Sequence, residues 1–289
     1  MSFNLKGAFS ALLTPFYNQR VDFESLQKHV EFQIKNGITG FVVNGTTAES
    51  PTLSWTEVEE IFACVKKVAG PKFPIILGTG SNSTQATVET TRKACQLGAD
   101  AVLVVVPYYN KPPQRGLVQH FVAVAAASTA PVILYNVPGR TITALSVESI
   151  SELAKQKNIV GIKEASGDLA FVKDVFSAVP NSFIKLSGDD ITYLPFLKLG
   201  GQGIISVMSN IIPKECMNWT NHPQESEVEF NRYLKLIQGM YVEANPIVPK
   251  WMLYKMGIFR SPEMRLPLVE LELSLQSSTE KLLKEFSLV

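Results

Sequence analysis

One apolar run shows the pattern that repeats along this chain: Ile159-Val160-Gly161-Ile162-Lys163-Glu164-Ala165. β-Branched residues dominate the run and polar residues flank it, which predicts a short buried strand. Lys163 ends this strand. An ammonium group beside a buried strand is unfavourable unless it is paired or loses its proton. Lys163 is therefore either half of an ion pair or, as a neutral amine, a nucleophile toward carbonyl groups.

Similar apolar runs lie on both sides of this strand, and amphipathic segments typical of helices separate them. Strands are expected at residues 8–13, 41–43, 75–77, 101–106, 132–135, 159–163, 183–187 and 203–207. Ser54, with Glu57 three residues later, forms a capping-box pattern that predicts the start of one of the helices. Eight strand–helix units in succession predict an α/β fold, a (β/α)8 TIM barrel. A doubly wound sheet is the alternative, but it rarely contains eight such even units.

The pattern changes after Pro223, where the alternation ends and helical segments follow one another. We therefore predict two domains. The first is a barrel catalytic domain at residues 1–224, and the second is a C-terminal helical appendage at residues 225–289.

Composition excludes several classes of protein. The 289 residues are 46% hydrophobic with a formal net charge of +1. A large core is therefore possible, and the absence of a basic block argues against nucleic-acid binding. No apolar stretch approaches the roughly 20 residues that a membrane helix needs. We expect no membrane partner.

Cysteine usage and the N-terminus indicate the compartment. Cys64, Cys95 and Cys216 are widely spaced and odd in number, which favours reduced thiols over disulfides. Residues 1–6 contain no apolar signal region. The chain is therefore expected to be cytoplasmic. Its three histidines lack metal-ligand spacing, so no metal site is expected.

Unusual polar residues follow the predicted strands, where catalytic residues of such a barrel lie. Four loops contain them: Gly45-Thr46-Thr47-Ala48-Glu49-Ser50, Pro107-Tyr108-Tyr109-Asn110, Tyr135-Asn136-Val137-Pro138-Gly139-Arg140-Thr141 and Gly188-Asp189-Asp190. The first loop can offer hydroxyls and backbone N–H groups to a carboxylate, although it could also be an ordinary polar turn. A lysine can form an imine, a tyrosine can move protons and an arginine can hold a carboxylate. Glu164 should point to the opposite strand face from Lys163, so we interpret it as a structural residue.

In combination, these motifs resemble those of the 4-hydroxy-tetrahydrodipicolinate synthases, which belong to the N-acetylneuraminate lyase-like class I aldolases. The resemblance spans nearly the whole chain. It rests on Gly45-Thr46-Thr47-x-Glu49-Ser50, Pro107-Tyr108-Tyr109-Asn110, Tyr135-Asn136-Val137-Pro138-x-Arg140-Thr141 and Ile162-Lys163-Glu164-Ala165. The paired threonines and Arg140 favour this branch over the sialic acid lyases. Those enzymes usually carry Ser-Thr in the first loop and no arginine at the position of Arg140.

The resemblance implies a carbon–oxygen lyase that condenses pyruvate with L-aspartate 4-semialdehyde, the first step of the diaminopimelate route to lysine. Lys163 would form a covalent imine with pyruvate, and no cofactor would be needed. Tyr135 would be the proton shuttle, linked through Thr46 to Tyr109 of a neighbouring subunit. A homotetramer built from two tight dimers is implied.

The resemblance also assigns residues to substrate binding. Thr47 would hold the pyruvate carboxylate, and Arg140 would hold the carboxylate of the semialdehyde. Gly188 and Ile205 would line the pocket, Gly188 because a side chain there would obstruct it. Two alternatives stay open: a pyruvate-dependent sugar-acid or N-acetylneuraminate lyase, and a catalytically idle barrel that binds small carboxylates.

The chain departs from the family pattern at two places. Ala48 occupies a position that is usually glycine, and alanine disfavours positive φ. Lysine-sensitive relatives often carry alanine, two histidines and a glutamate in an interface cleft, and this chain has Pro51, Trp55, Val58 and Ala86 there. Ser50, Asn82 and Tyr108 are kept. We therefore expect little or no inhibition by L-lysine.

Overall fold

The computed structural model of the chain describes residues 5–289. The expectation about an N-terminal signal region falls largely on residues 1–4 and so lies outside the described residues. Among residues 5–289, no helix combines the length and the apolar character that crossing a bilayer requires.

Eight parallel strands within the described part of the chain close into a barrel, which confirms the predicted fold class and excludes the doubly wound sheet. Around the barrel the order is β1 (Gly7–Ala11), β10 (Gly203–Ser206), β9 (Ile184–Ser187), β8 (Ile159–Glu164), β7 (Val132–Asn136), β6 (Ala101–Val105), β5 (Ile75–Gly78) and β4 (Gly40–Val43). All four residues of β4 and all five of β7 are buried. Such continuous apolar strands are typical of a parallel sheet that is covered on both faces. A short antiparallel hairpin of β2 (Phe16–Tyr17) and β3 (Arg20–Val21) follows β1.

Helices alternate with the strands as the sequence predicts. They are α1 (Phe23–Lys35), α2 (Trp55–Ala69), α3 (Thr84–Leu97), α4 (Gln114–Ala127), α5 (Pro138–Thr141), α6 (Val147–Leu153), α7 (Leu169–Ala178) and α8 (Tyr193–Lys198). Further helices follow β10: α9 (Pro213–Asn221), α10 (Glu227–Gly239), α11 (Ile247–Lys255) and α12 (Leu273–Glu285). The Ser54 capping box at the start of α2 is present, because the Ser54 side chain accepts from the Glu57 backbone N–H and the Glu57 carboxylate accepts from the Ser54 backbone N–H.

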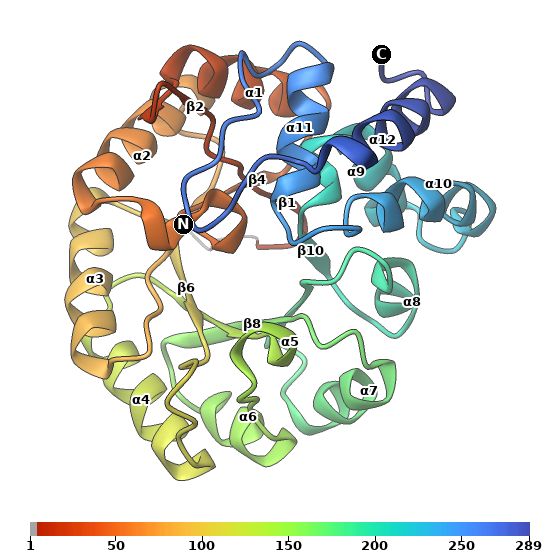
Figure 1. Cartoon of the computed structure of the whole chain (residues 1–289). Coiled ribbons are helices and arrows are strands. Elements are labelled where there is room, and N and C mark those ends of the chain that lie inside the picture. The colour runs from red at the N-terminus through yellow and green to blue at the C-terminus, as the bar shows by residue number, and fades with distance from the viewer. Residues whose placement is uncertain (1–4) are drawn as a thin grey trace. The chain divides into compact units, whose positions relative to one another are not determined.

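The contacts of the chain divide it into two compact units. The first contains the residues up to Gly7 together with Pro74–Ile205, and the second contains Ala8–Phe73 together with Ser206–Val289. In the first unit, α3, α4, α6 and α7 lie outside the strands β6 and β8 (Figure 1). The second unit contains α1 and α2 as well as the helices that follow β10. The predicted domain boundary between residues 224 and 225 stays a prediction.

Candidate active site

Lys163 lies near the C-terminal end of β8 and is only 6% exposed. Strand pairing aligns it with Tyr135 of β7 and with Leu186 of β9. Partners in register on a parallel sheet share a face, so these three side chains point the same way. The Lys163 Nζ atom is 4.2 Å from the centroid of the Tyr135 ring, and Tyr135 is itself buried. The structure therefore brings the expected nucleophile and the expected proton shuttle into contact.

The surroundings of Lys163 bear on its alternative role as half of an ion pair. Within residues 5–289, no carboxylate forms a salt bridge with its Nζ atom. The ring of Tyr135 is the cation-binding surface that the structure places beside it. The contacts of Lys163 therefore do not support its interpretation as half of an ion pair. Its role in forming an imine stays a prediction.

Burial alone does not single out Lys163, because Lys185 and Lys250 are also buried. Lys185 is aligned with Ile162, the residue before Lys163, so its side chain lies on the opposite face of the sheet. Its Nζ atom sits 4.9 Å from the ring centroid of Phe176 on α7. Lys250 lies on α11 and is paired with a glutamate. Strand face and partner distinguish the three lysines.

Gly188 follows β9 and lies against the lysine. A Cβ atom built at Gly188 would be 2.7 Å from Lys163 Cε and 2.7 Å from Ala165 Cβ. Such distances are shorter than real Cβ contacts, so a side chain at this position would displace Lys163. On β10, Gly203 is aligned with Leu186, and Ile205 lies two residues further along the same face. The geometry is compatible with the expected places of Gly188 and Ile205, whose contact with substrate stays a prediction.

Arg140 lies on α5, which directly follows β7, and its side chain is exposed. The loop that carries it is closed at its base by Asn136. The Asn136 amide donates to Glu164 Oε2 at 2.8 Å, and its Oδ1 atom accepts from the Leu145 backbone N–H at 3.0 Å. The loop between residues 136 and 145 is therefore held to the end of β8, next to Lys163.

Glu164 faces away from Lys163, as strand alternation predicts. Its Oε1 atom accepts from the Ser166 backbone N–H at 2.6 Å, and its other oxygen accepts from Asn136. Burial raises the pKa of the Glu164 carboxyl, and the hydrogen bonds from Ser166 and Asn136 oppose this rise. Glu164 is a structural tie between the ends of β7 and β8, which agrees with its interpretation from the sequence.

Tyr109 lies in the loop after β6 and is 88% exposed, with φ at 74°. Positive φ is uncommon for a residue with a side chain, and an exposed aromatic ring contributes little to the stability of its own subunit. The loop is held by Asn110, whose amide donates to the Asn82 backbone carbonyl at 2.8 Å. A ring exposed in this way is available for contact with another molecule. The expected role of Tyr109 at a neighbouring subunit stays a prediction.

Thr46 and Thr47 lie in the second unit, in a 3-10 turn at Thr46–Ala48. Thr47 is 4% exposed, and its Oγ1 atom accepts from the Asn245 amide at 3.0 Å. Ala48 is buried within this turn and does not have positive φ, so its methyl group is tolerated. The left-handed residue is the next one, Glu49, with φ at 60°.

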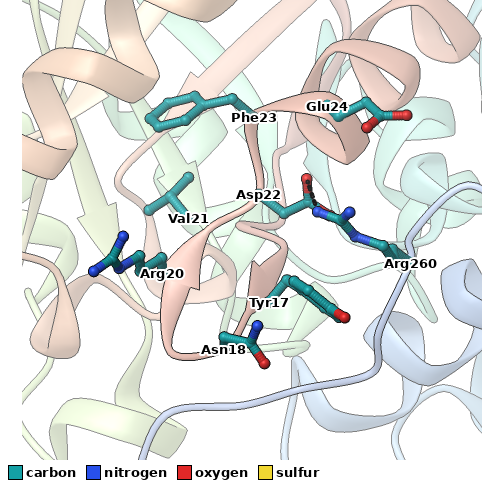
Figure 2. A pocket seen from close by; sticks show the side chains of 8 residues that line it. All are labelled: Tyr17, Asn18, Arg20, Val21, Asp22, Phe23, Glu24 and Arg260. Atoms are coloured by element: carbon teal, nitrogen blue, oxygen red, sulfur yellow. Dashed lines mark ion pairs between the residues drawn. The ribbon is translucent and has the colours of Figure 1, made fainter.

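A hollow in the second unit lies over the β2–β3 hairpin, and Figure 2 shows its lining: Tyr17, Asn18, Arg20, Val21, Asp22, Phe23, Glu24 and Arg260. Asp22 and Arg260 are paired at 3.4 Å, and the Arg260 guanidinium lies 4.0 Å from the ring centroid of Tyr17. None of the expected site residues lines this hollow. Its central charges neutralise one another, so we assign no chemistry to it.

The sequence did not reveal the group formed by the buried Lys250 and Glu49 and the half-buried Arg265. Lys250 is fully buried, and burial lowers its pKa to about 8, although Glu49 opposes this shift. Lys250 and Glu49 are 201 residues apart in the chain. No local pattern could have joined them. The only available signal was a glutamate inside the hydroxyl loop and a lysine within an apolar helical segment.

Comparisons with known proteins identify related chains. The model of the dihydrodipicolinate synthetase family matches residues 4–286. A 4-hydroxy-tetrahydrodipicolinate synthase from Bdellovibrio bacteriovorus is 52% identical over 273 residues, which cover 93% of each chain.

Two solved structures of dihydrodipicolinate synthases resemble the chain closely. One, from Acinetobacter baumannii, is described as chloride-inhibited and complexed with pyruvate. It is 40% identical with a TM-score of 0.96 and covers 99% of this chain and 100% of that one. The other, from Cyanidioschyzon merolae with lysine bound, is 39% identical with a TM-score of 0.93 and covers 98% of this chain and 99% of that one.

Proposed function

The chain belongs to the dihydrodipicolinate synthetase family and is a lyase, and from this premise we propose that it condenses pyruvate with L-aspartate 4-semialdehyde. The observation that carries the proposal is the pair of Lys163 and Tyr135. A buried lysine that has no carboxylate partner among the described residues lies against a buried tyrosine at the C-terminal end of neighbouring barrel strands. This is the end of the barrel at which such folds carry their chemistry.

The proposed chemistry begins when the Lys163 amine attacks the ketone carbon of pyruvate and water leaves, giving an imine. Loss of a proton from the pyruvate methyl group gives an enamine, whose terminal carbon attacks the aldehyde carbon of the semialdehyde. The amine of the adduct then displaces the Lys163 amine and closes the ring. Every bond is formed by the two substrates and Lys163, so the proposal needs no cofactor.

The other residues have roles that follow from their chemistry and from the family resemblance. Tyr135 would relay protons, with Thr46 and a neighbouring subunit's Tyr109 completing the relay. Thr47 would bind the pyruvate carboxylate. Arg140, exposed on the short helix α5, would bind the carboxylate of the semialdehyde with its planar fork.

The assembly and the setting belong to the same proposal. A homotetramer of two tight dimers would supply Tyr109 across a subunit interface. The enzyme would act in the cytoplasm, in lysine synthesis by the diaminopimelate route. A relative from Cyanidioschyzon merolae has been solved with lysine bound. For this chain we still predict weak or no inhibition, because Trp55, Val58 and Ala86 supply no charged partner.

A direct assay tests the proposal. Purified protein given pyruvate and L-aspartate 4-semialdehyde should form the cyclic product, and the Lys163→Ala variant should form almost none while keeping its fold. N-Acetylneuraminate serves as the comparison substrate. Release of pyruvate from that sugar acid, with no cyclic product from the condensation, would replace the proposed synthase by an N-acetylneuraminate or sugar-acid lyase.

A further inference from the structure

The chain segment around α11 forms hydrogen bonds with the loop that carries Thr47. Asn245 donates to the Thr47 hydroxyl at 3.0 Å, and both groups are buried. Two residues after Thr47, the Glu49 carboxylate is 0% exposed and accepts from the Lys250 ammonium and from the Arg265 backbone N–H at 3.1 Å. The C-terminal segment therefore binds the loop at two adjacent points, and both are internal to the second unit.

Glu49 adopts a backbone conformation that glutamate does not favour. Its φ and ψ are 60° and 38°, in the left-handed region, where it ends one 3-10 turn and begins the next at Ser50–Thr52. A residue with a side chain stays in that region only when its surroundings hold it there. The ion pair with Lys250 and the hydrogen bond from the Arg265 backbone N–H supply such a constraint.

Lys250 has its own fixed environment. Its ammonium also donates to the Glu263 backbone carbonyl at 3.1 Å and lies 4.3 Å from the ring centroid of Phe16. Burial lowers its pKa to about 8, and the contacts with Glu49 oppose this shift. Because both groups are removed from water, neither can exchange its partner for solvent.

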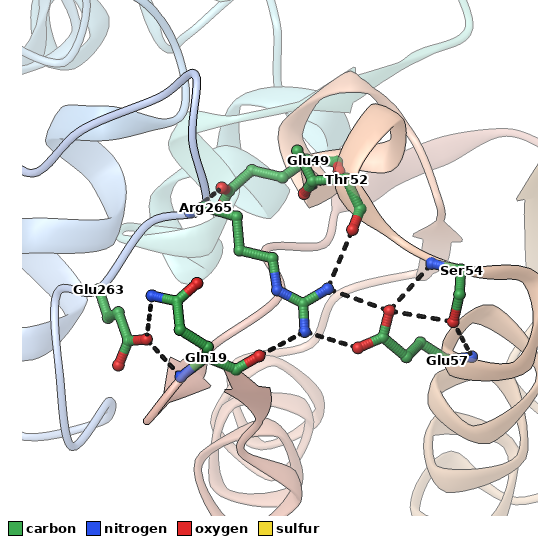
Figure 3. A network of polar contacts seen from close by, with 7 residues as sticks. All are labelled: Gln19, Glu49, Thr52, Ser54, Glu57, Glu263 and Arg265. Atoms are coloured by element: carbon green, nitrogen blue, oxygen red, sulfur yellow. Dashed lines mark hydrogen bonds and ion pairs between the residues drawn. The ribbon is translucent and has the colours of Figure 1, made fainter.

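Arg265 fixes the far end of the same loop, as Figure 3 shows. Its guanidinium donates to both oxygens of Glu57 at 2.6 and 3.0 Å, and to the Thr52 backbone carbonyl at 3.0 Å. It also donates at 2.7 Å to the backbone carbonyl of Gln19, which lies in the turn of the β2–β3 hairpin. One residue thus binds Glu49 through its main chain and the end of the loop through its side chain.

We propose that Glu49, Lys250 and Arg265, called here the Glu49 network, are positioning residues that fix Thr47 for binding the carboxylate of pyruvate. This inference rests on the proposed function and adds a role for the C-terminal segment in substrate affinity. The network touches no reacting atom. It acts by removing the conformational freedom that the loop would otherwise lose when pyruvate binds. Without the network, the free enzyme populates other loop shapes, and pyruvate affinity falls.

Variants of the charged pair test the inference. Lys250→Met keeps an unbranched side chain one heavy atom shorter than lysine and removes the charge and the donors. Lys250→Met combined with Glu49→Gln removes both charges and leaves no buried carboxylate unpaired. Lys255→Met is the matched control, because Lys255 lies on the same helix and its pair with Glu280, at 3.1 Å, is partly exposed. Each protein is measured for thermal stability, kcat, KM for both substrates, and half-saturation of pyruvate in borohydride trapping.

The two effects should separate. Lys250→Met should lose stability and show a pyruvate KM raised about tenfold or more, equivalent to about 1.4 kcal/mol of binding. KM for the semialdehyde should change by less than about threefold, because the variant loses affinity for pyruvate only. The double variant should regain stability, because no unpaired buried charge remains, yet keep the raised pyruvate KM. Lys255→Met should match the wild type.

Other outcomes have definite meanings. If the double variant regains both stability and wild-type pyruvate KM, the network is structural only and the inference is overturned. If Lys250→Met does not fold, the pyruvate KM of the double variant and of Glu49→Gln decides the question. A raised KM in both supports the inference, and a wild-type KM in both overturns it. If wild-type protein forms no cyclic product but is still trapped with pyruvate, the proposed synthase fails, and half-saturation of trapping alone judges the network. If wild-type protein is not trapped at all, both ideas fall.

Discussion

At the scale of single residues, Lys163 is distinguished by its neighbours more than by its burial. Among residues 5–289 three lysines are buried, but Lys250 has a carboxylate partner and Lys185 faces the helices. Lys163 alone of the three shares a strand face with a tyrosine at the end of a neighbouring strand. Its reactivity should therefore depend on the space and the groups on that face.

Gly188→Ala tests how tightly that face is filled. The added methyl group would come within 2.7 Å of Lys163 Cε, so the lysine must move away from its place beside Tyr135. We expect kcat to fall about tenfold or more, a rise of about 1.4 kcal/mol in the barrier. Gly116→Ala is the control, because its methyl group would meet neighbours only at 3.6 Å. Unchanged turnover in Gly188→Ala would show that the added methyl group fits without displacing Lys163.

At the scale of elements, the start of α2 joins local capping to a long-range ion pair. Glu57 closes the capping box with Ser54 and also binds the Arg265 guanidinium. The hydrogen bond from Arg265 is the largest cause that lowers the pKa of Glu57 to about 2. Folding therefore depends on pH through this carboxyl group.

Glu57→Gln isolates that dependence, because glutamine can still close a capping box. The unfolded chain protonates Glu57 near its ordinary pKa of 4.5, and the folded chain does so only near 2. The charge therefore stabilises the fold above about pH 5, and its contribution is lost as the pH falls toward 2. Denaturant unfolding should show the variant less stable by about 1 kcal/mol at neutral pH, a value limited by solvent screening. The difference should shrink toward about pH 3.

The exposed Glu60 on the same helix provides the comparison for this measurement. The free energy of unfolding of Glu60→Gln should match that of the wild type across the pH range. A deficit in Glu57→Gln that stays constant with pH would mean that the Arg265 contact does not operate through charge.

Most helices and strands could be predicted, because the signals for them lie in neighbouring residues of the sequence. Apolar runs such as β6 and capping patterns such as that of Ser54 are written in neighbouring residues, so their strands and helices follow from short-range physics. The order of strands in a barrel then places Lys163 near Tyr135, because consecutive strands of this fold are neighbours. The Glu49 network could not be predicted, because its pairing crosses 201 residues and depends on where α11 packs.

At the scale of the whole molecule, the proposed assembly gives a role to the exposed Tyr109. Its ring is 88% exposed, and its backbone is held at positive φ. If the ring completes the proton relay of a neighbouring subunit, then one chain alone lacks a complete site.

Mixed assemblies test this arrangement. Lys163→Ala chains and Tyr109→Phe chains should each be nearly inactive alone. Hybrid dimers would contain one intact site, with Lys163 from one chain and Tyr109 from the other. Random pairing should restore up to about a quarter of the wild-type activity. Absence of rescue, with subunit exchange confirmed by mass spectrometry, would show that Tyr109 acts within its own chain or not at all.

Lys163 is proposed to form the imine with pyruvate, and chemical trapping is the sharpest test of that role. Borohydride reduces an imine to a stable amine, so incubation with pyruvate and borohydride should leave a three-carbon adduct that peptide mass spectrometry can locate. We expect adduct on Lys163 alone, with matching loss of activity, and none in Lys163→Ala or Lys163→Arg, since a guanidinium cannot form the imine. Adduct on Lys185 or Lys250, or full inactivation with Lys163 unmodified, would contradict this role.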